Sequence, residues 1–193
     1  MRVVAVNGSP RTGGNTAMLV EAVFEPLRAS GIECEQIALA GQTVGGCTAC
    51  MRCRSAADRQ CHGRSDFGNE VITALDGADG IILASPVYFA DVTAELKAII
   101  DRAGYVARGS EGMFVRALGA GVVTHRRAGA IHALDTINHF FLIGQMIVVG
   151  STYWNLGVGG ARGEVANDEE GLRTMRTLGE NIGWLLGRIG GER

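Results

Sequence analysis

The chain has 193 residues, of which 47% are hydrophobic, and its formal net charge is −2. This length and composition suit one domain that has a buried core and an insertion. The small net charge and the lack of a basic block disfavour nucleic-acid binding, and no apolar run is long enough to span a membrane. No signal peptide precedes the first predicted strand, so we expect a cytoplasmic protein. Its five cysteines are then expected to be ligands or free thiols and not disulfides.

The first predicted strand, residues 3–6, leads into a loop that begins a helix. A short run rich in Val suits a strand buried on both faces of a parallel sheet. Gly, Ser and Pro interrupt the strand at residues 8–14. From Asn15 an apolar pattern of helical period predicts a helix to about Ala29, with Gly31 after its end. The segment therefore predicts a strand, a tight loop and a helix N-terminus, which is a site that attracts anions.

The polar side chains of this loop suit a phosphate monoester. Ser9 and Thr16 carry hydroxyl groups, Asn15 an amide and Arg11 a planar cation. The loop has neither the lysine of a P-loop nor the G-x-G-x-x-G pattern of a dinucleotide-binding turn. The alternative is an ordinary strand–helix turn in which these residues only cap the helix.

Apolar runs and helical patterns alternate along the rest of the chain. An edge or half-buried strand at 32–39 precedes a stretch of about 40–68 with little periodicity, which is typical of a functional or disordered loop. The later predictions are a short helix at 69–77, a buried strand at 80–85, an amphipathic helix at 92–103, a buried strand at 118–123, a helix at 130–143, a buried strand at 145–150, an irregular segment at 151–167 and a final helix capped by Asn167 or Asp168.

This alternation predicts an α/β fold with a parallel sheet and helices on both faces. Five strands favour the flavodoxin-like order 2-1-3-4-5, in which ligands bind beyond the carboxyl ends of strands 1 and 3. The loops at 8–15, 86–89 and 124–129 should therefore converge on one crevice.

Three segments resemble the NAD(P)H-dependent FMN reductase-like flavoproteins: VNGSPRTGGNT at 6–16, SPVYF at 85–89 and LKAIIDR at 96–102. The cysteine-bearing stretch is similar to the iron–sulfur flavoprotein branch of that family. The resemblance implies a flavodoxin-like homodimer or homotetramer that binds FMN and carries a [4Fe–4S] cluster in an insertion after strand 2. It also implies NAD(P)H as an electron donor.

The resemblance further implies which residues contact FMN. They are Ser9, Arg11, Gly14, Asn15 and Thr16 around the phosphate, Pro86, Val87, Tyr88 and Phe89 beside the isoalloxazine ring, and Thr124, Arg126 and Gly129 at its other edge. For Tyr88 and Phe89 the alternative is plain core packing. The 124–129 loop departs from the family pattern, which often has two adjacent glycines where Ala128-Gly129 stands here.

The second motif is a set of cysteines with short spacings, Cys47-x2-Cys50-x2-Cys53-x7-Cys61. Three closely spaced thiolates and a more distant fourth resemble the ligands of a cubane iron–sulfur cluster. Four sulfurs would also suit tetrahedral zinc, and free thiols in a flexible loop are the third reading. Cys34 lies within a predicted strand and is expected in the core.

Other polar residues have simpler interpretations. His125 could face a flavin but is expected to be a surface or capping residue. Asp66 suits a helix cap, and Lys97, Asp101 and Arg102 suit a solvated ion pair or a subunit contact. No side chain is expected to act as a catalytic acid or base, because the cofactors supply the redox chemistry.

Three functions follow from these patterns. The first is an oxidoreductase that passes electrons between FMN, a cluster and a small-molecule or protein acceptor. The second is an NAD(P)H-dependent FMN or quinone reductase without a cluster. The third is a non-enzymatic electron carrier like flavodoxin, for which a net charge of −2 gives little electrostatic support.

Overall fold

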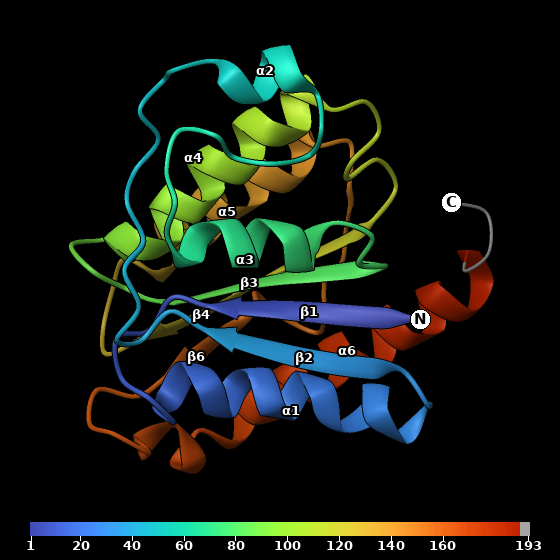
Figure 1. The fold of residues 1–193 in the computed structure, drawn as a ribbon. Helices are drawn as coiled ribbons and strands as arrows, with labels where there is room; N and C mark the ends of the chain where they lie inside the picture. The colour runs from blue at the N-terminus through green and yellow to red at the C-terminus, as the bar shows by residue number, and fades with distance from the viewer. Residues whose placement is uncertain (190–193) are drawn as a thin grey trace.

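The computed structural model describes residues 1–189 as a parallel sheet with helices on both faces (Figure 1). The strands are β1 (Arg2–Asn7), β2 (Glu33–Ala38), β3 (Gly80–Pro86), β4 (Leu118–His125), β5 (Ile147–Val148) and β6 (Leu156–Val158). Their order is β2-β1-β3-β4-β5, and β6 also pairs with β4. The predicted flavodoxin-like order is confirmed.

The helices form one layer on each side of the sheet (Figure 1). The layers consist of α1 (Asn15–Ala29) and α6 (Glu169–Ile189) on one side and α3 (Phe67–Leu75), α4 (Ala94–Gly109) and α5 (Ala130–Ile143) on the other. The short helix α2 (Arg52–Ala56) packs on α4, and the 3-10 helix η1 (Glu164–Asn167) precedes α6. No helix in residues 1–189 is long and apolar enough to cross a membrane.

Alternation along the central strands divides the core into two parts. In β1, Val4 and Val6 face the core under α3, α4 and α5, while Val3 and Ala5 face the core under α1 and α6. All four side chains are fully buried. A strand with both faces covered is therefore almost wholly apolar, as the sequence of residues 3–6 indicated.

Two predictions near the far edge of the sheet are wrong. The expected buried strand at 145–150 is only Ile147–Val148, and both residues are exposed because β5 ends the main strand order and, within residues 1–189, pairs with β4 alone. The segment 151–167, expected to be irregular, contains β6 and η1. A three-residue strand with Gly157 at its centre carries no periodic signal that sequence reading could detect.

The contact between α1 and α6 depends on a small residue, and this allows a stability prediction. A Cβ at Gly179 would overlap the carbonyl of Val23 and lie 2.6 Å from Cγ of Pro26. We expect Gly179→Ala to lower the free energy of unfolding by about 1–3 kcal/mol, because the helices must separate. Gly187→Ala is the matched control on the same helix, since its Cβ would meet nothing within 4 Å. It should raise stability by up to about 1 kcal/mol through helix propensity. Urea unfolding measures both, and equal effects of the two changes would contradict the packing argument.

Candidate functional site

The loops at the carboxyl ends of β1, β3 and β4 enclose a cavity of about 180 Å³. Its lining residues are Ser9, Pro10, Arg11, Asn15, Thr16, Pro86, Val87, Tyr88, Thr124, His125, Arg126, Gly159 and Gly160. The convergence of the three predicted loops is confirmed. In a parallel α/β sheet this is the edge at which ligands bind.

The turn between β1 and α1 is fixed by its own polar groups. The Asn7 carboxamide oxygen accepts the N–H of Ser9 at 2.9 Å, and the Ser9 hydroxyl accepts the N–H of Arg11 at 3.2 Å. The hydroxyls of Thr16 and Thr124 lie 2.5 Å apart and join this turn to the end of β4. Gly14 occupies the N-cap of α1, where no side chain of the described residues caps the helix. The first N–H groups of α1, which have no partner within the helix, and the helix dipole therefore favour an anion at this end of the cavity.

The segment around Gly160 also lines the cavity, although it lies far along the chain and sequence analysis did not assign it to the site. Arg11 donates to the carbonyl of Gly160 at 3.1 Å, and Asn15 donates to that of Ala161 at 2.8 Å. The Glu164 carboxylate accepts the N–H groups of Gly160 and Ala161, both at 2.7 Å, and so holds the turn. These hydrogen bonds keep the pKa of Glu164 below its ordinary value. The run G-V-G-G at 157–160 was the available sequence signal for a close backbone approach.

All the residues expected to contact FMN line this cavity except Gly14, Phe89 and Gly129. Phe89 is fully exposed at a positive φ of 46°, and Tyr88 is 47% exposed, so the core-packing alternative is wrong for both. Gly129 has φ +85° and packs closely against the turn that follows β3, because a Cβ there would lie 2.8 Å from Cα of Ala90. Flavin contacts from these residues stay predictions.

His125, expected on the surface or at a cap, instead lines the cavity. Its Nδ1 is buried and finds no hydrogen-bond partner within residues 1–189. A buried polar atom without a partner is costly in a folded protein. A ligand with hydrogen-bonding groups at its edge, such as a flavin ring, would satisfy this atom, so the cavity's donor set fits FMN.

The cysteine stretch forms a second, smaller cavity beside α4. Cys47, Cys50, Cys53 and Cys61 all line this space of about 20 Å³, and Arg102 lines it with them. Cys34 packs instead against the core on the α1 side of the sheet. No three His, Cys, Asp or Glu side chains within the described residues are grouped to hold a metal ion, so metal ligation by the four cysteines stays a prediction.

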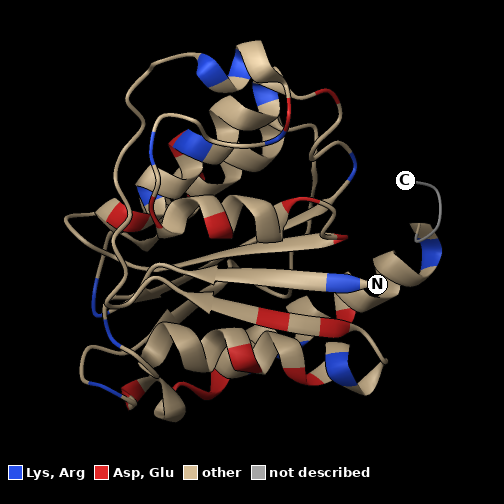
Figure 2. Ribbon diagram, in the orientation of Figure 1, with Lys and Arg blue, Asp and Glu red and all other residues tan. Residues whose placement is uncertain are grey.

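The environment of the thiols differs from one cysteine to the next. The backbone N–H and side chain of Arg52, with the Thr48 hydroxyl, lower the pKa of Cys50 to about 7. Burial raises the pKa of Cys53. Figure 2 shows Lys and Arg gathered around α2, which carries Arg52 and Arg54. A positive surrounding favours thiolates, which are the form that binds metals.

A sequence profile of the family described as NADPH-dependent FMN reductase matches residues 1–161. The chain belongs to this family. It is 38% identical over 192 residues to an iron-sulfur flavoprotein of Methanocaldococcus jannaschii, with 94% of this chain and 95% of that protein covered. These matches make it an FMN-dependent oxidoreductase of the iron–sulfur flavoprotein branch.

Solved structures agree with this assignment at the level of fold. RosB, crystallised with 8-demethyl-8-formylriboflavin-5'-phosphate, superposes with a TM-score of 0.75 at 15% identity, covering 98% of this chain and 80% of RosB. A flavodoxin from the domain Archaea gives a TM-score of 0.63 at 14% identity, with 97% and 99% covered. At such identities the likeness establishes the flavodoxin-like fold of this FMN reductase family member.

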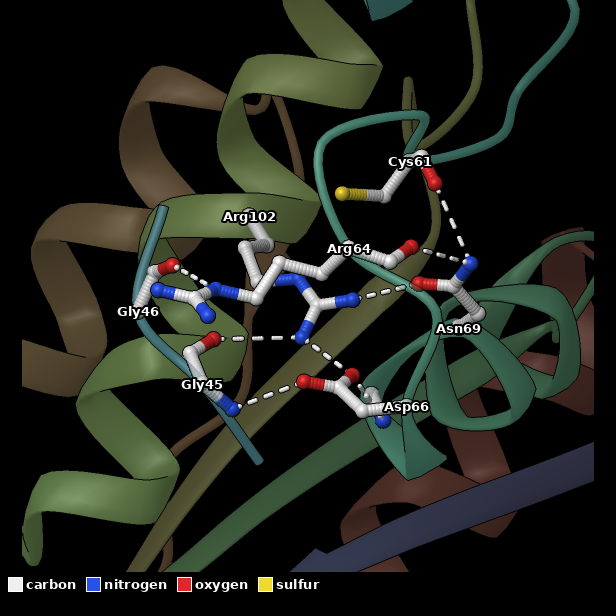
Figure 3. Close-up of polar contacts among 8 residues, drawn as sticks. Gly45, Gly46, Cys61, Arg64, Asp66, Asn69 and Arg102 are labelled. Carbon is white, nitrogen blue, oxygen red and sulfur yellow. Dashed lines mark hydrogen bonds and ion pairs between the residues drawn. The ribbon is translucent and has the colours of Figure 1, made fainter. Parts of the chain in front are cut away.

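In this flavoprotein, one residue of the α4 motif has a different environment from the one predicted. Lys97 and Asp101 form the expected exposed ion pair at 2.5 Å, but the Arg102 side chain is 0% exposed. The expectation that Arg102 is solvated or at a subunit contact is wrong, because its side chain lies against the cysteine stretch and lines the cavity there (Figure 3). The neighbouring Asp66 caps α3 as predicted, by accepting the N–H of Gly68.

Proposed function

We propose that this flavoprotein transfers electrons between FMN, bound in the larger cavity, and a [4Fe–4S] cluster held by Cys47, Cys50, Cys53 and Cys61. The observation that carries the proposal is that these four thiols, all from the segment that connects β2 to α3 in the chain, line one small cavity beside α4. The donor and the acceptor are small molecules or proteins, and the family description, which names NADPH, supports NAD(P)H as a donor.

For FMN, the proposed roles follow from the chemistry of the cavity. FMN exchanges electrons in pairs or singly, and the cluster exchanges one at a time. The N-terminus of α1, with the hydroxyls of Ser9 and Thr16, would hold the phosphate, and Arg11 would neutralise it. Tyr88 would cover the ring and His125 would bond its polar edge. Thr124 and Arg126 would complete the wall at the end of β4.

For the cluster, the donor set is the argument. Four cysteine thiolates are the common ligands of cubane clusters, and two-residue gaps let three of them turn toward one centre. The same four cysteines suit tetrahedral zinc, which brings no sulfide. The content of acid-labile sulfide therefore distinguishes a cluster from zinc.

The test is the composition and spectrum of protein purified without oxygen. We expect one FMN, about four iron atoms and about four acid-labile sulfides per chain, with a broad absorbance under the flavin bands. Zinc without sulfide would replace the cluster by a structural metal. FMN with no metal and no sulfide would leave an NAD(P)H-dependent FMN or quinone reductase. Turnover of NAD(P)H with a soluble acceptor then separates an enzyme from a carrier.

The position of Tyr88, which lines the larger cavity, allows a prediction. Tyr88→Ala should weaken FMN and riboflavin binding by a similar factor, because the side chain faces the cavity but not the proposed phosphate end. With the side chain 47% exposed, the fold should survive and the melting temperature should change little. Fluorescence titration of both flavins measures the effect. Phe89→Ala is the matched variant: a loss as large as that of Tyr88→Ala would mean that Phe89 folds onto the bound ring.

A further inference from the structure

Arg102 carries a buried charge that lies outside the larger cavity and has no role in the proposed FMN site. Arg102 is among the largest fully buried side chains, and its charged group lies in the layer of α3 and α4. Enclosing a cation costs free energy unless it is bonded on several sides. The contacts of Arg102 therefore indicate what the charge stabilises.

Arg102 bonds the chain on both sides of the four cysteines, at Gly45 before them and at Asp66 and Asn69 after them (Figure 3). Its Nη1 donates to the carbonyl of Gly45 at 3.1 Å and to Asp66 at 2.6 Å, and its Nη2 donates to the Asn69 carboxamide oxygen. Asp66 also accepts the N–H of Gly45 at 2.8 Å. These bonds fix the entry to the segment, two residues before Cys47.

The same network reaches the other end of the segment. The Asn69 amide donates to the carbonyl of Cys61 at 3.1 Å and to that of Arg64 at 3.0 Å. A Cβ at Gly68 would overlap the Arg102 guanidinium, so a side chain there would have to displace this group from its hydrogen bonds. The chain on both sides of the cysteines is thus tied to one cation.

Two observations indicate that the Arg102 guanidinium acts on the cysteine site. Arg102 lines the small cavity together with all four cysteines. Its Nε is buried and has no hydrogen-bond partner in the described part of the chain, although its other nitrogens are bonded. The four cysteines line the same cavity as this buried donor, so a thiolate or sulfide bound there would supply the acceptor that it lacks.

We infer that Arg102 is a positioning residue for the cysteine site that also raises the reduction potential of the cluster bound there. The inference rests on the proposed function, because it requires a cluster in this cavity. A cluster gains negative charge on reduction, so a nearby buried cation and a hydrogen bond to sulfur favour the reduced form. Low exposure to water increases the effect of the charge.

The experiment compares four variants, purified without oxygen, by iron content and by redox titration followed by electron paramagnetic resonance. In Arg102→Met the ratio of reduced to oxidised cluster at a fixed potential should fall at least tenfold, which is about 59 mV for a one-electron couple. Arg102→Lys keeps the charge and should recover part of this shift. Asp66→Asn removes the opposing charge and should move the ratio in the opposite direction. Arg108→Met removes an exposed charge from the same helix and should leave the ratio within about twofold of wild type.

The outcomes separate the inference from the proposed function. Wild type without iron and sulfide would reject the proposed function itself. Wild type with a cluster whose potential is unchanged in Arg102→Met would overturn the inference alone. If Arg102→Met holds no iron, the potentials of Arg102→Lys and Asp66→Asn are the test. An unchanged potential in Asp66→Asn would then show that Arg102 has only a structural role.

Discussion

Cys50→Ser should abolish the iron, the sulfide and the broad visible absorbance while FMN remains bound. Cys50 lines the small cavity with the other three thiols, and the bonds to its sulfur favour the thiolate. A serine hydroxyl is a poor replacement because it does not ionise near neutral pH. The larger cavity, proposed to hold FMN, lies at the carboxyl end of β1 and the N-terminus of α1 and shares no lining residue with the cysteine cavity. Transfer to a one-electron protein acceptor should fall far more than two-electron reduction of a quinone.

Cys34→Ser is the matched control for this change. Cys34 is a partly buried thiol that packs against the core on the other side of the sheet, so iron and sulfide should match wild type. Equal iron content in Cys50→Ser and wild type would remove Cys50 from the ligand set. Loss of iron in both variants would indicate a general destabilisation and not loss of a ligand.

Arg11→Ala combined with Asn15→Ala should weaken FMN binding about a hundredfold and riboflavin binding much less. Both side chains line the cavity beside the N-terminus of α1, where only FMN presents a phosphate. A hydrogen bond to a charged group is worth about 1.5–3 kcal/mol. Each residue therefore contributes about tenfold or more in affinity. Titration of flavin fluorescence with the apoprotein measures both ligands.

Arg162→Ala is the control for a charge lost from the same region. Arg162 bonds the carbonyl of Thr12 at 2.6 Å but does not line the cavity, so affinity for either flavin should change by less than about threefold. Arg11 and Asn15 also bond the 160–161 backbone, and loosening of that turn would affect both flavins alike. An equal loss of FMN and riboflavin in the double variant would thus argue against a phosphate contact.

The sequence predicted well what depends on local pattern. Buried strands, the exact span of α1 and the convergence of three loops follow from apolar runs, turn residues and the known order of parallel sheets. The Asp66 cap was readable because a carboxylate before an apolar helical pattern satisfies free N–H groups.

The parts that failed depend on long-range packing. Arg102 stands in a helix with charged neighbours, and only the placement of α2 and the 45–66 segment over α4 shows that it is buried. His125 is the last residue of β4, a position that is often at the surface, and only the three-dimensional structure shows that its Nδ1 is buried beside the cavity without a partner in the described residues. The 157–164 segment joins the site across about three quarters of the chain, a distance that no local pattern encodes.

That long separation has a consequence for the order in which the protein becomes functional. The contacts of Arg11, Asn15 and Thr12 reach partners 149, 146 and 150 residues away. Pairings of such separation form late in folding, because a long chain must close before they are made. During synthesis, the first loop to emerge is therefore among the last to be completed. We expect nascent chains stalled before residue 158 to retain little FMN and chains stalled well beyond residue 168 to retain it, which pull-down with labelled flavin would measure.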